Sequence, residues 1–280
     1  MKYANLHLHS TYSDCQLTPL QLVLIGKSLG YRALALTDHW TDCGVEEFFA
    51  ATKKEGLHSL AGVEFDSSDL GTSIHITGLD FDRDHPKMRA LIDNQREART
   101  ECTRKTFEWG VEHGFIEGAT WDDVMMIAGE GSWVCIDHVI RTLRLRRVMP
   151  AVGGDQDLRA KVFWAPEVKA FSPKKPTIEE IIRTIREADG VACIAHPHNQ
   201  IKYLPALIDM GLNGIEISHP DLFGASTRLA CEAADTYKLY RSGGTDHTGA
   251  MSGCDGNNAI PALQGVTEEE FFTLKERRLD

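Results

Sequence analysis

The stretch Asn5-Leu6-His7-Leu8-His9-Ser10-Thr11-Tyr12-Ser13-Asp14 organises our interpretation of the whole chain. His7 and His9 stand two residues apart at the end of a short apolar run. In a β-strand, residues i and i+2 point to the same face, so both imidazoles can reach one point in space. Neutral imidazole is the commonest metal ligand, and Asp14 adds an oxygen donor nearby. The stretch therefore suggests a strand end that faces a metal site, although two polar residues at any strand end would give the same pattern.

The composition is that of a globular protein from a reducing compartment. The chain has 280 residues, of which 42% are apolar and 25% charged, which suits one large domain or a domain with an insertion. Seven scattered cysteines form no C-x-x-C pair, and this favours free thiols. No apolar run approaches a membrane span, and the N-terminal residues lack the apolar segment of a signal peptide. We therefore expect a cytoplasmic protein without membrane contact.

The charge is distributed unevenly along the chain. The net charge of −11 argues against nonspecific binding to a nucleic-acid polymer. Between Arg83 and Lys175, however, 16 Lys and Arg residues stand against 14 Asp and Glu residues. A solvated helical surface would show the same mixture. Beside a carboxylate-rich site, such a segment could also supply cations to an anionic substrate.

Strand and helix signals alternate along most of the sequence. The predicted strands cover residues 4–7, 33–37, 59–64, 74–76, 191–195, 214–217 and 239–243. The predicted helices begin near residues 18, 45, 87, 120, 136, 177, 204, 225 and 268, and loops are expected at 153–154 and 166–176. Alternation of this kind predicts an α/β fold with a parallel sheet, and about seven units suggest a (β/α)7 barrel. We expect residues 1–85 and 170–280 to form the barrel and residues 86–169 to form a helical insertion, or cap.

Each predicted strand runs into a residue that can bind a metal ion. This set consists of His7, His9, His39, Glu64, His75, His196, His219, Asp246 and His247. Barrel active sites lie at the carboxyl ends of the strands, so these side chains should converge on one face although they span the whole sequence. Any single histidine could be structural, but chance would rarely place all of them at strand ends.

Several longer motifs resemble those of a known family. They are Leu6 to Asp14, Leu36-Thr37-Asp38-His39, Gly62-Val63-Glu64 with His75, Gly190 to Pro197, Gly214-Ile215-Glu216-Ile217 and Gly243-Gly244-Thr245-Asp246. With these motifs the chain resembles the PHP (polymerase and histidinol phosphatase) family of metal-dependent phosphoesterases, in the branch that acts on small phosphorylated metabolites and nucleotides. The resemblance covers nearly the whole chain. It implies a distorted seven-stranded barrel with a trinuclear metal centre.

The resemblance also assigns the metal ligands residue by residue. One metal would be held by His7, His9, Glu64 and Asp246. Glu64 would bridge to a second metal, completed by His75 and His196, and a third would be held by Asp14 and His39. Asp38 would contact one of the ligating side chains without binding the metal itself, and so orient it. Nitrogen and oxygen ligands without thiolate suit Zn, Mn or Fe, so we expect two to three such ions.

Two departures from the family pattern affect the expected site. The family reads Asp-x-His where this chain has Asp246-His247-Thr248, and we favour His247 as a ligand of the third metal over a role in substrate contact or proton transfer. In the insertion, His138 matches the family, but Ile136 replaces the arginine that contacts phosphate. The candidates for substrate binding are His138, Arg141, Arg144, Lys169 and His198, each of which could equally be an ordinary surface residue.

The expected reaction is hydrolysis of a small phosphoester, namely a nucleotide, a sugar phosphate or a small cyclic phosphodiester. Metal-bound hydroxide would attack phosphorus, and a protonated His219 or His247 would serve as general acid, with Asp38 in support. One alternative is a metal-dependent amide hydrolase, although such barrels usually carry a ligating lysine and none follows a strand end here. Another is a noncatalytic PHP module that only binds metal and a partner.

Overall fold

A single seven-stranded sheet forms the centre of the molecule. The computed structural model describes residues 2–150, 153–246 and 264–279. The strands are β1 (Ala4–Asn5), β2 (Ala33–Leu36), β3 (His58–Ser67), β4 (Ile74–Leu79), β5 (Val191–Ile194), β6 (Gly214–Ser218) and β7 (Tyr240–Gly243). They lie side by side in the order of the sequence, which is the arrangement of a barrel sheet.

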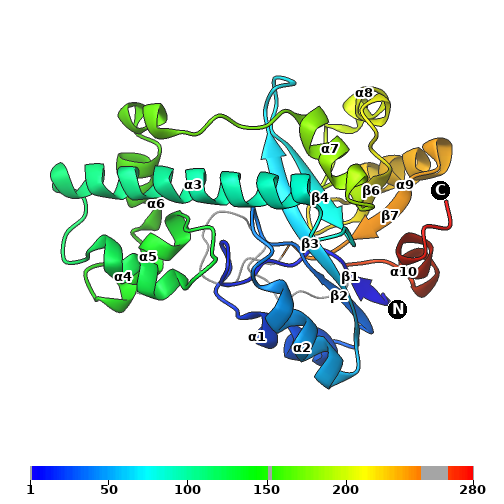
Figure 1. Ribbon diagram of the computed structural model, residues 1–280, viewed down its shortest axis with the longest axis horizontal. Coiled ribbons are helices and arrows are strands. Elements are labelled where there is room, and N and C mark those ends of the chain that lie inside the picture. The colour runs from blue at the N-terminus through cyan, green and yellow to red at the C-terminus, as the bar shows by residue number, and fades with distance from the viewer. Residues whose placement is uncertain (1, 151–152, 247–263, 280) are drawn as a thin grey trace.

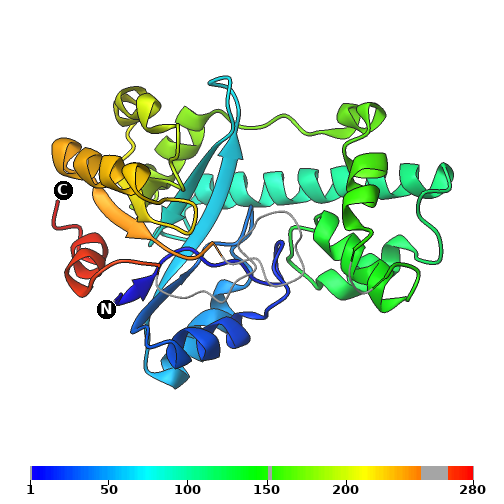
Figure 2. The ribbon, with the colours of Figure 1, turned by 180° about the vertical axis from the view of Figure 1, so that it is seen from behind.

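Contacts between the first and last strands nearly close this sheet into a barrel. The Leu6 amide donates to the Gly243 carbonyl at 2.9 Å, and the Asp246 amide donates to the His7 carbonyl at 3.0 Å. Between them, a Cβ on Gly244 would lie 2.4 Å from the His7 nitrogen, so the seam tolerates only glycine there. The result is a distorted seven-stranded α/β barrel, as the sequence predicts (Figures 1 and 2).

The expectation of a wholly parallel sheet is wrong at β4. This strand pairs antiparallel with both β3 and β5, whereas the other neighbouring pairs are parallel. The physical reason is that β3 and β4 are joined directly by residues 68–73, and a connection this short cannot carry the crossover that parallel strands need. His75 is therefore the second residue of its strand rather than the last. The reversed direction still brings it to the end of the barrel where the parallel strands terminate.

Helices pack around the outside of the barrel. They are α1 (Pro19–Ser28), α2 (Val45–Glu55), α7 (Ile178–Glu187), α8 (Leu204–Asp209), α9 (Ala225–Tyr237) and α10 (Glu268–Lys275), with a short 3₁₀ turn η3 (Ile201–Tyr203) before α8. Their starts follow the capping signals in the sequence. Thr18 caps α1 with Pro19 in its first turn, and Gln21 completes a capping box. Ile181, Ile182 and Ile185 of α7 are fully buried in the main core.

The segment after β4 forms a separate group of helices to one side of the barrel. It contains α3 (Pro86–Glu112), α4 (Trp121–Ala128), α5 (Ile136–Leu145), α6 (Asp155–Leu158), a π-helical turn η1 (Arg159–Phe163) and a 3₁₀ turn η2 (Pro166–Phe171). The long helix α3 leads away from the barrel, and α4, α5 and α6 gather at its far end (Figure 1). These helices share their own buried cluster, which includes Phe107, Val124, Val139, Leu143 and Val162.

Part of the loop predicted over residues 166–176 is helical, because residues 166–171 form a 3₁₀ turn. This turn, like those at 155–158 and 159–163, spans too few residues to show a helical hydrophobic period. None of the helices within the described ranges combines the length and apolar composition needed to cross a lipid bilayer.

Candidate metal centre

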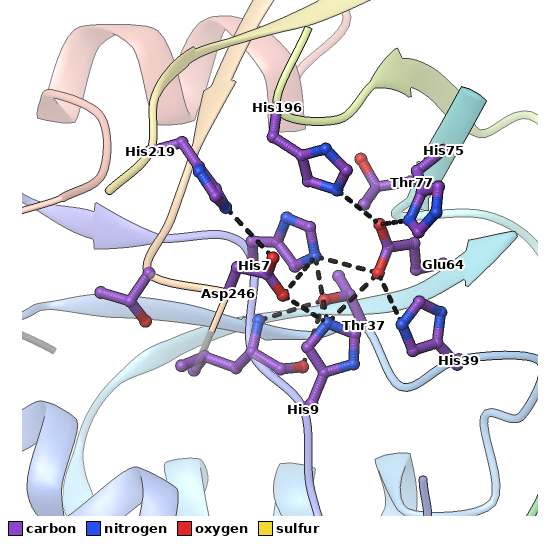
Figure 3. A network of polar contacts seen from close by, with 12 residues as sticks. His7, His9, Thr37, His39, Glu64, His75, Thr77, His196, His219 and Asp246 are labelled. Atoms are coloured by element: carbon purple, nitrogen blue, oxygen red, sulfur yellow. Dashed lines mark hydrogen bonds and ion pairs between the residues drawn. The ribbon is translucent and has the colours of Figure 1, made fainter. Parts of the chain in front are cut away.

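Three buried side chains and the partly exposed Asp246 meet at one end of the barrel. His7 Nε2 lies 3.1 Å from His9 Nε2, 3.2 Å from Glu64 Oε2 and 3.4 Å from Asp246 Oδ1. His9 Nε2 lies 3.2 Å from the same Glu64 oxygen and 2.9 Å from the same Asp246 oxygen. Four potential ligand atoms thus surround one small volume, as Figure 3 shows. The structure brings together the set that the resemblance assigns to the first metal.

Glu64 connects this group to further histidines. Its Oε1 lies 2.9 Å from His75 Nδ1 and 3.3 Å from His196 Nε2, while its Oε2 lies 3.3 Å from His39 Nε2. The carboxylate is 1% exposed and lies among five imidazoles, those of His7 and His9 together with these three (Figure 3). Glu64 therefore lies between the two groups of histidines. His39 contacts both groups. The residue-by-residue assignment had placed His39 at the third metal alone.

Asp14 completes a third group of ligand atoms. It lies 3.5 Å from His9 Nδ1 and 3.9 Å from His39 Nε2. Within the described residues, three sets of side chains place their ligand atoms within 4.8 Å of one another: His7, His9, Glu64 and Asp246; His9, Asp14 and His39; and His39, Glu64 and His75. The spacing accommodates more than one cation, and Glu64, His9 and His39 are each shared between sets.

The buried charges strongly perturb the titration of these groups. Burial disfavours protonation of His7 and His9, but the surrounding carboxylates outweigh it and raise the pKa of both imidazoles. Burial favours the neutral forms of Glu64 and Asp246, yet the adjacent imidazoles hold the pKa of both carboxyls well below the usual range. For His39, burial dominates and lowers the pKa. The carboxylates therefore stay ionised and require positive charge beside them.

The donor chemistry fits divalent transition metals. Imidazole nitrogens and carboxylate oxygens, with no thiolate among the converging described side chains, are the ligands of Zn, Mn and Fe sites. His7 Nε2 and His9 Nε2 face each other at 3.1 Å, a pairing that a shared cation would satisfy better than a single proton. In addition, His9 Nδ1 is buried and has no hydrogen-bond partner among the described residues. Two facing imidazole nitrogens and a buried nitrogen without a hydrogen-bond partner are the features expected of side chains that bind a cation.

Glu216 contacts a candidate ligand in a way that the sequence alone did not reveal. It is fully buried in the middle of β6, where its Oε1 accepts a hydrogen bond from His7 Nδ1 at 2.9 Å. Its Oε2 accepts the backbone N–H of His196 at 2.6 Å. The carboxylate keeps the proton of His7 on Nδ1 and so leaves the Nε2 lone pair directed into the centre. The only sequence signal was a glutamate in the otherwise apolar run Gly214–Ile217.

The contacts of His219 determine which of its nitrogens holds the proton. The Asp221 amide donates to His219 Nδ1 at 3.1 Å, so the neutral ring carries its proton on Nε2. That Nε2–H donates to Asp246 Oδ2 at 3.1 Å (Figure 3). His219 therefore contacts the centre through Asp246 and orients that carboxylate.

Asp38 supports the loop after β1 rather than a histidine. Its fully buried carboxylate accepts hydrogen bonds from the Ser10 amide at 2.6 Å, the Ser10 hydroxyl at 2.6 Å and the Ser13 hydroxyl at 2.5 Å. The expectation that it orients a ligand is met only indirectly, because Ser10 follows His9 and Ser13 precedes Asp14. A single carboxylate thus positions the backbone on either side of the loop that carries two candidate ligands.

The substrate-binding candidates of the insertion occupy different environments. His138 accepts a hydrogen bond from the Cys135 amide at Nδ1 and donates from Nε2 to the Thr11 carbonyl, and burial lowers its pKa to about 4. Both of its nitrogens are therefore engaged with backbone. Arg141 donates to the Cys15 carbonyl at 2.6 Å, while Arg144 pairs with Asp155 at 3.2 Å.

Two remaining candidates lie near the surface. Lys169 is exposed on η2, and His198 is 40% exposed with its Nε2 3.9 Å from Asp221. His247 belongs to residues 247–263, which lie outside the described part of the chain. Its neighbour Asp246 has a φ of +47°, so the extended backbone of β7 ends there. His196 also has a positive φ, +31°, and this strain coincides with the metal centre.

Comparison with known proteins places this geometry in a family. The model of the PHP domain matches residues 5–110. A 5'-3' exoribonuclease of Haemophilus influenzae is 32% identical over 203 residues, which make up 70% of this chain and 69% of that protein. A 3',5'-nucleoside bisphosphate phosphatase of Chromobacterium violaceum is 30% identical over 263 residues, or 88% of this chain and 87% of the relative.

A solved structure shares the fold over the full length. It comes from Bifidobacterium adolescentis, is described as a metal-dependent phosphoesterase, and matches with a TM-score of 0.80 at 24% identity, covering 99% of this chain and 96% of the other. Together with the His-x-His strand end and the bridging Glu64, these likenesses confirm the resemblance seen in the sequence. The chain belongs to the PHP family of metal-dependent phosphoesterases and is a phosphoric ester hydrolase.

Proposed function

We propose that this protein hydrolyses a small phosphorylated metabolite, namely a nucleotide, a sugar phosphate or a small cyclic phosphodiester. The observation that carries the proposal is the convergence of three ligand sets on the buried carboxylate of Glu64 and its neighbours. We assign two to three Mn, Zn or Fe ions to these sets, with His7, His9, Glu64 and Asp246 around the first. The others would use His75 and His196 with Glu64, and Asp14 with His39.

Metal ions bound at this centre would neutralise phosphoryl oxygens and lower the pKa of water at neutral pH. The protein side chains then have distinct tasks. Glu216 holds His7 in the tautomer that can ligate, and His219 holds Asp246 through its Nε2 proton. Since His219 Nδ1 already accepts a hydrogen bond, this ring cannot take a second proton without losing that bond. We therefore assign His219 a positioning role on Asp246 rather than the general-acid role, and keep His247 as the proposed ligand of the third metal.

The insertion at residues 86–169 is proposed to act as a cap that shapes the substrate pocket. It contacts the loop after β1 at four points, through Trp133, Cys135, His138 and Arg141. Among the cations named as substrate-binding candidates, Arg141 lies beside the loop that carries Asp14, where its guanidinium donates to the Cys15 carbonyl. A pocket bounded by this cap and the barrel suits a small ester better than the interior of a polymer.

A second candidate is removal of nucleotides from the 5' end of RNA. The likeness to the exoribonuclease of Haemophilus influenzae favours it. The net charge of −11 opposes it, because a long polyanion would meet a repulsive surface.

The deciding experiment is a phosphate-release screen with Mn, Zn and Fe. The panel contains nucleoside bisphosphates, nucleoside monophosphates, sugar phosphates, small cyclic phosphodiesters and a 5'-phosphorylated RNA oligonucleotide. Turnover of a small ester with no shortening of the oligonucleotide supports the first proposal. Stepwise shortening of the oligonucleotide without turnover of any small ester would replace it with the second.

A further inference from the structure

Arg99 approaches the metal centre from α3 without forming the hydrogen bonds that such burial normally demands. Its side chain is 12% exposed, and its guanidinium stacks 3.7 Å above the ring of Trp40, the residue after His39. Its nearest carboxylate oxygen is on Asp66, 3.4 Å from Nη2. Nε and Nη2 are nevertheless buried and make no hydrogen bond within the described ranges. An arginine in this state has donor capacity to spare.

Arg99 shares its carboxylate partner with another cation. Asp66 lies opposite His75 in the β3–β4 ladder and two residues beyond Glu64. Lys175 also pairs with this carboxylate, and Trp40 Nε1 donates to it at 3.0 Å. Within the described residues, two cations thus share one carboxylate beside His75, and Arg99 is only partly engaged by it.

Trp133 presents a second unused donor on the other side of His39. The residue lies between α4 and α5, and its backbone N–H donates to the Tyr12 carbonyl at 3.0 Å. Its ring meets the His39 ring edge to face, with centroids 5.6 Å apart. The indole Nε1 is buried, and no described residue accepts its hydrogen bond. A buried indole N–H usually finds an acceptor, so an acceptor supplied by a ligand would complete the site.

We propose that Arg99 and Trp133 form an anion-binding pair that takes the non-bridging phosphoryl oxygens of the substrate on the His39–His75 side of the centre. The inference rests on the proposed function and deepens it. The two donors come from the insertion and the metal ligands come from the barrel, so the substrate is held between these parts. Arg99 contributes charge and a planar set of donors, while Trp133 contributes one neutral hydrogen bond.

The test measures binding of inorganic phosphate to the metal-loaded protein by calorimetry, together with metal content. Trp133→Phe keeps an aromatic side chain and removes the N–H with part of the indole, and Arg99→Gln removes the charge. We expect the affinity for phosphate to fall about threefold to tenfold for Trp133→Phe and at least tenfold for Arg99→Gln, with unchanged metal content. The matched controls are Trp164→Phe, at a ring that is 57% exposed, and Arg104→Gln, at an arginine further along α3.

Phosphate affinity within twofold of wild type in both variants would overturn the pair. Loss of metal from Arg99→Gln would likewise overturn its part, because it would show a structural role. If that variant does not fold, Trp133→Phe decides the inference, since it keeps an aromatic ring at this position. A wild-type protein that cleaves no ester in the panel, but loses phosphate affinity on these substitutions, would refute the proposed function and leave this pair supported.

Discussion

Replacing Glu216 with glutamine should weaken metal binding without changing the shape of the site. The carboxylate accepts two hydrogen bonds, from His7 Nδ1 at 2.9 Å and from the His196 amide at 2.6 Å. A glutamine amide offers one accepting oxygen and one donating NH₂. If its oxygen serves the His196 amide, its NH₂ meets His7 Nδ1 and moves the imidazole proton to Nε2, where it blocks ligation. If the amide is flipped, the NH₂ instead opposes the N–H of His196.

Either orientation costs one hydrogen bond to a charged acceptor in a site with no solvent access. Such a bond contributes about 1.5–3 kcal/mol, which corresponds to roughly a 10- to 150-fold loss of affinity. This range agrees with the 10- to 100-fold effect that is typical when the partner of a ligating histidine is removed. The expected effect on the apparent Kd for Mn is thus about one to two orders of magnitude.

The assay is calorimetric titration of Mn into chelator-treated protein, with a thermal melt of each metal-free variant as the folding check. Glu232→Gln on the exposed face of α9 is the matched control, because Glu232 pairs only with Arg228 at the surface. An Mn affinity for Glu216→Gln within threefold of wild type would refute the reasoning. It would mean that the His7 tautomer does not depend on this carboxylate.

Four further outcomes test the centre. Complete chelation should lower the Tm by about 8–16 °C in a thermal melt, since ligand at 1,000 times its Kd adds about 4 kcal/mol; an unchanged Tm would contradict a buried multinuclear site. His219→Gln should reduce turnover about tenfold by misaligning Asp246. A fall of a hundredfold or more, together with loss of the basic limb of the pH–rate profile, would instead identify His219 as the general acid. Asp38→Asn should lower the free energy of unfolding in urea by about 1.5–3 kcal/mol, because at least one of its three hydrogen bonds is lost. A stability equal to that of wild type would argue against the role of Asp38 in the loop. His247→Ala should leave one fewer metal per chain by elemental analysis if it ligates, while an unchanged count with at least a hundredfold lower turnover would assign it to proton transfer alone.

The chemistry of the site was predictable from the sequence because it depends on residue types at local spacings. The two-residue period of a strand places His7 and His9 on one face, and helix caps such as Thr18 and Thr177 mark element boundaries that the structure reproduces. Alternating strands and helices then bring strand ends to one side of a barrel. This is enough to identify a metal-binding α/β barrel and most of its converging side chains.

Other features depend on which distant segments pack together, and local patterns do not encode that. The direction of β4 follows from its direct connection to β3, and it moves His75 from the end of a strand to its beginning. Glu216 meets His7 across 209 positions of sequence. The backbone at His196 and Asp246 adopts positive φ values, which are uncommon for any residue other than glycine. Strand periodicity specifies the face of a side chain, whereas barrel closure specifies its partner, and so the hydrogen bonds that tune each ligand exist only in the folded molecule.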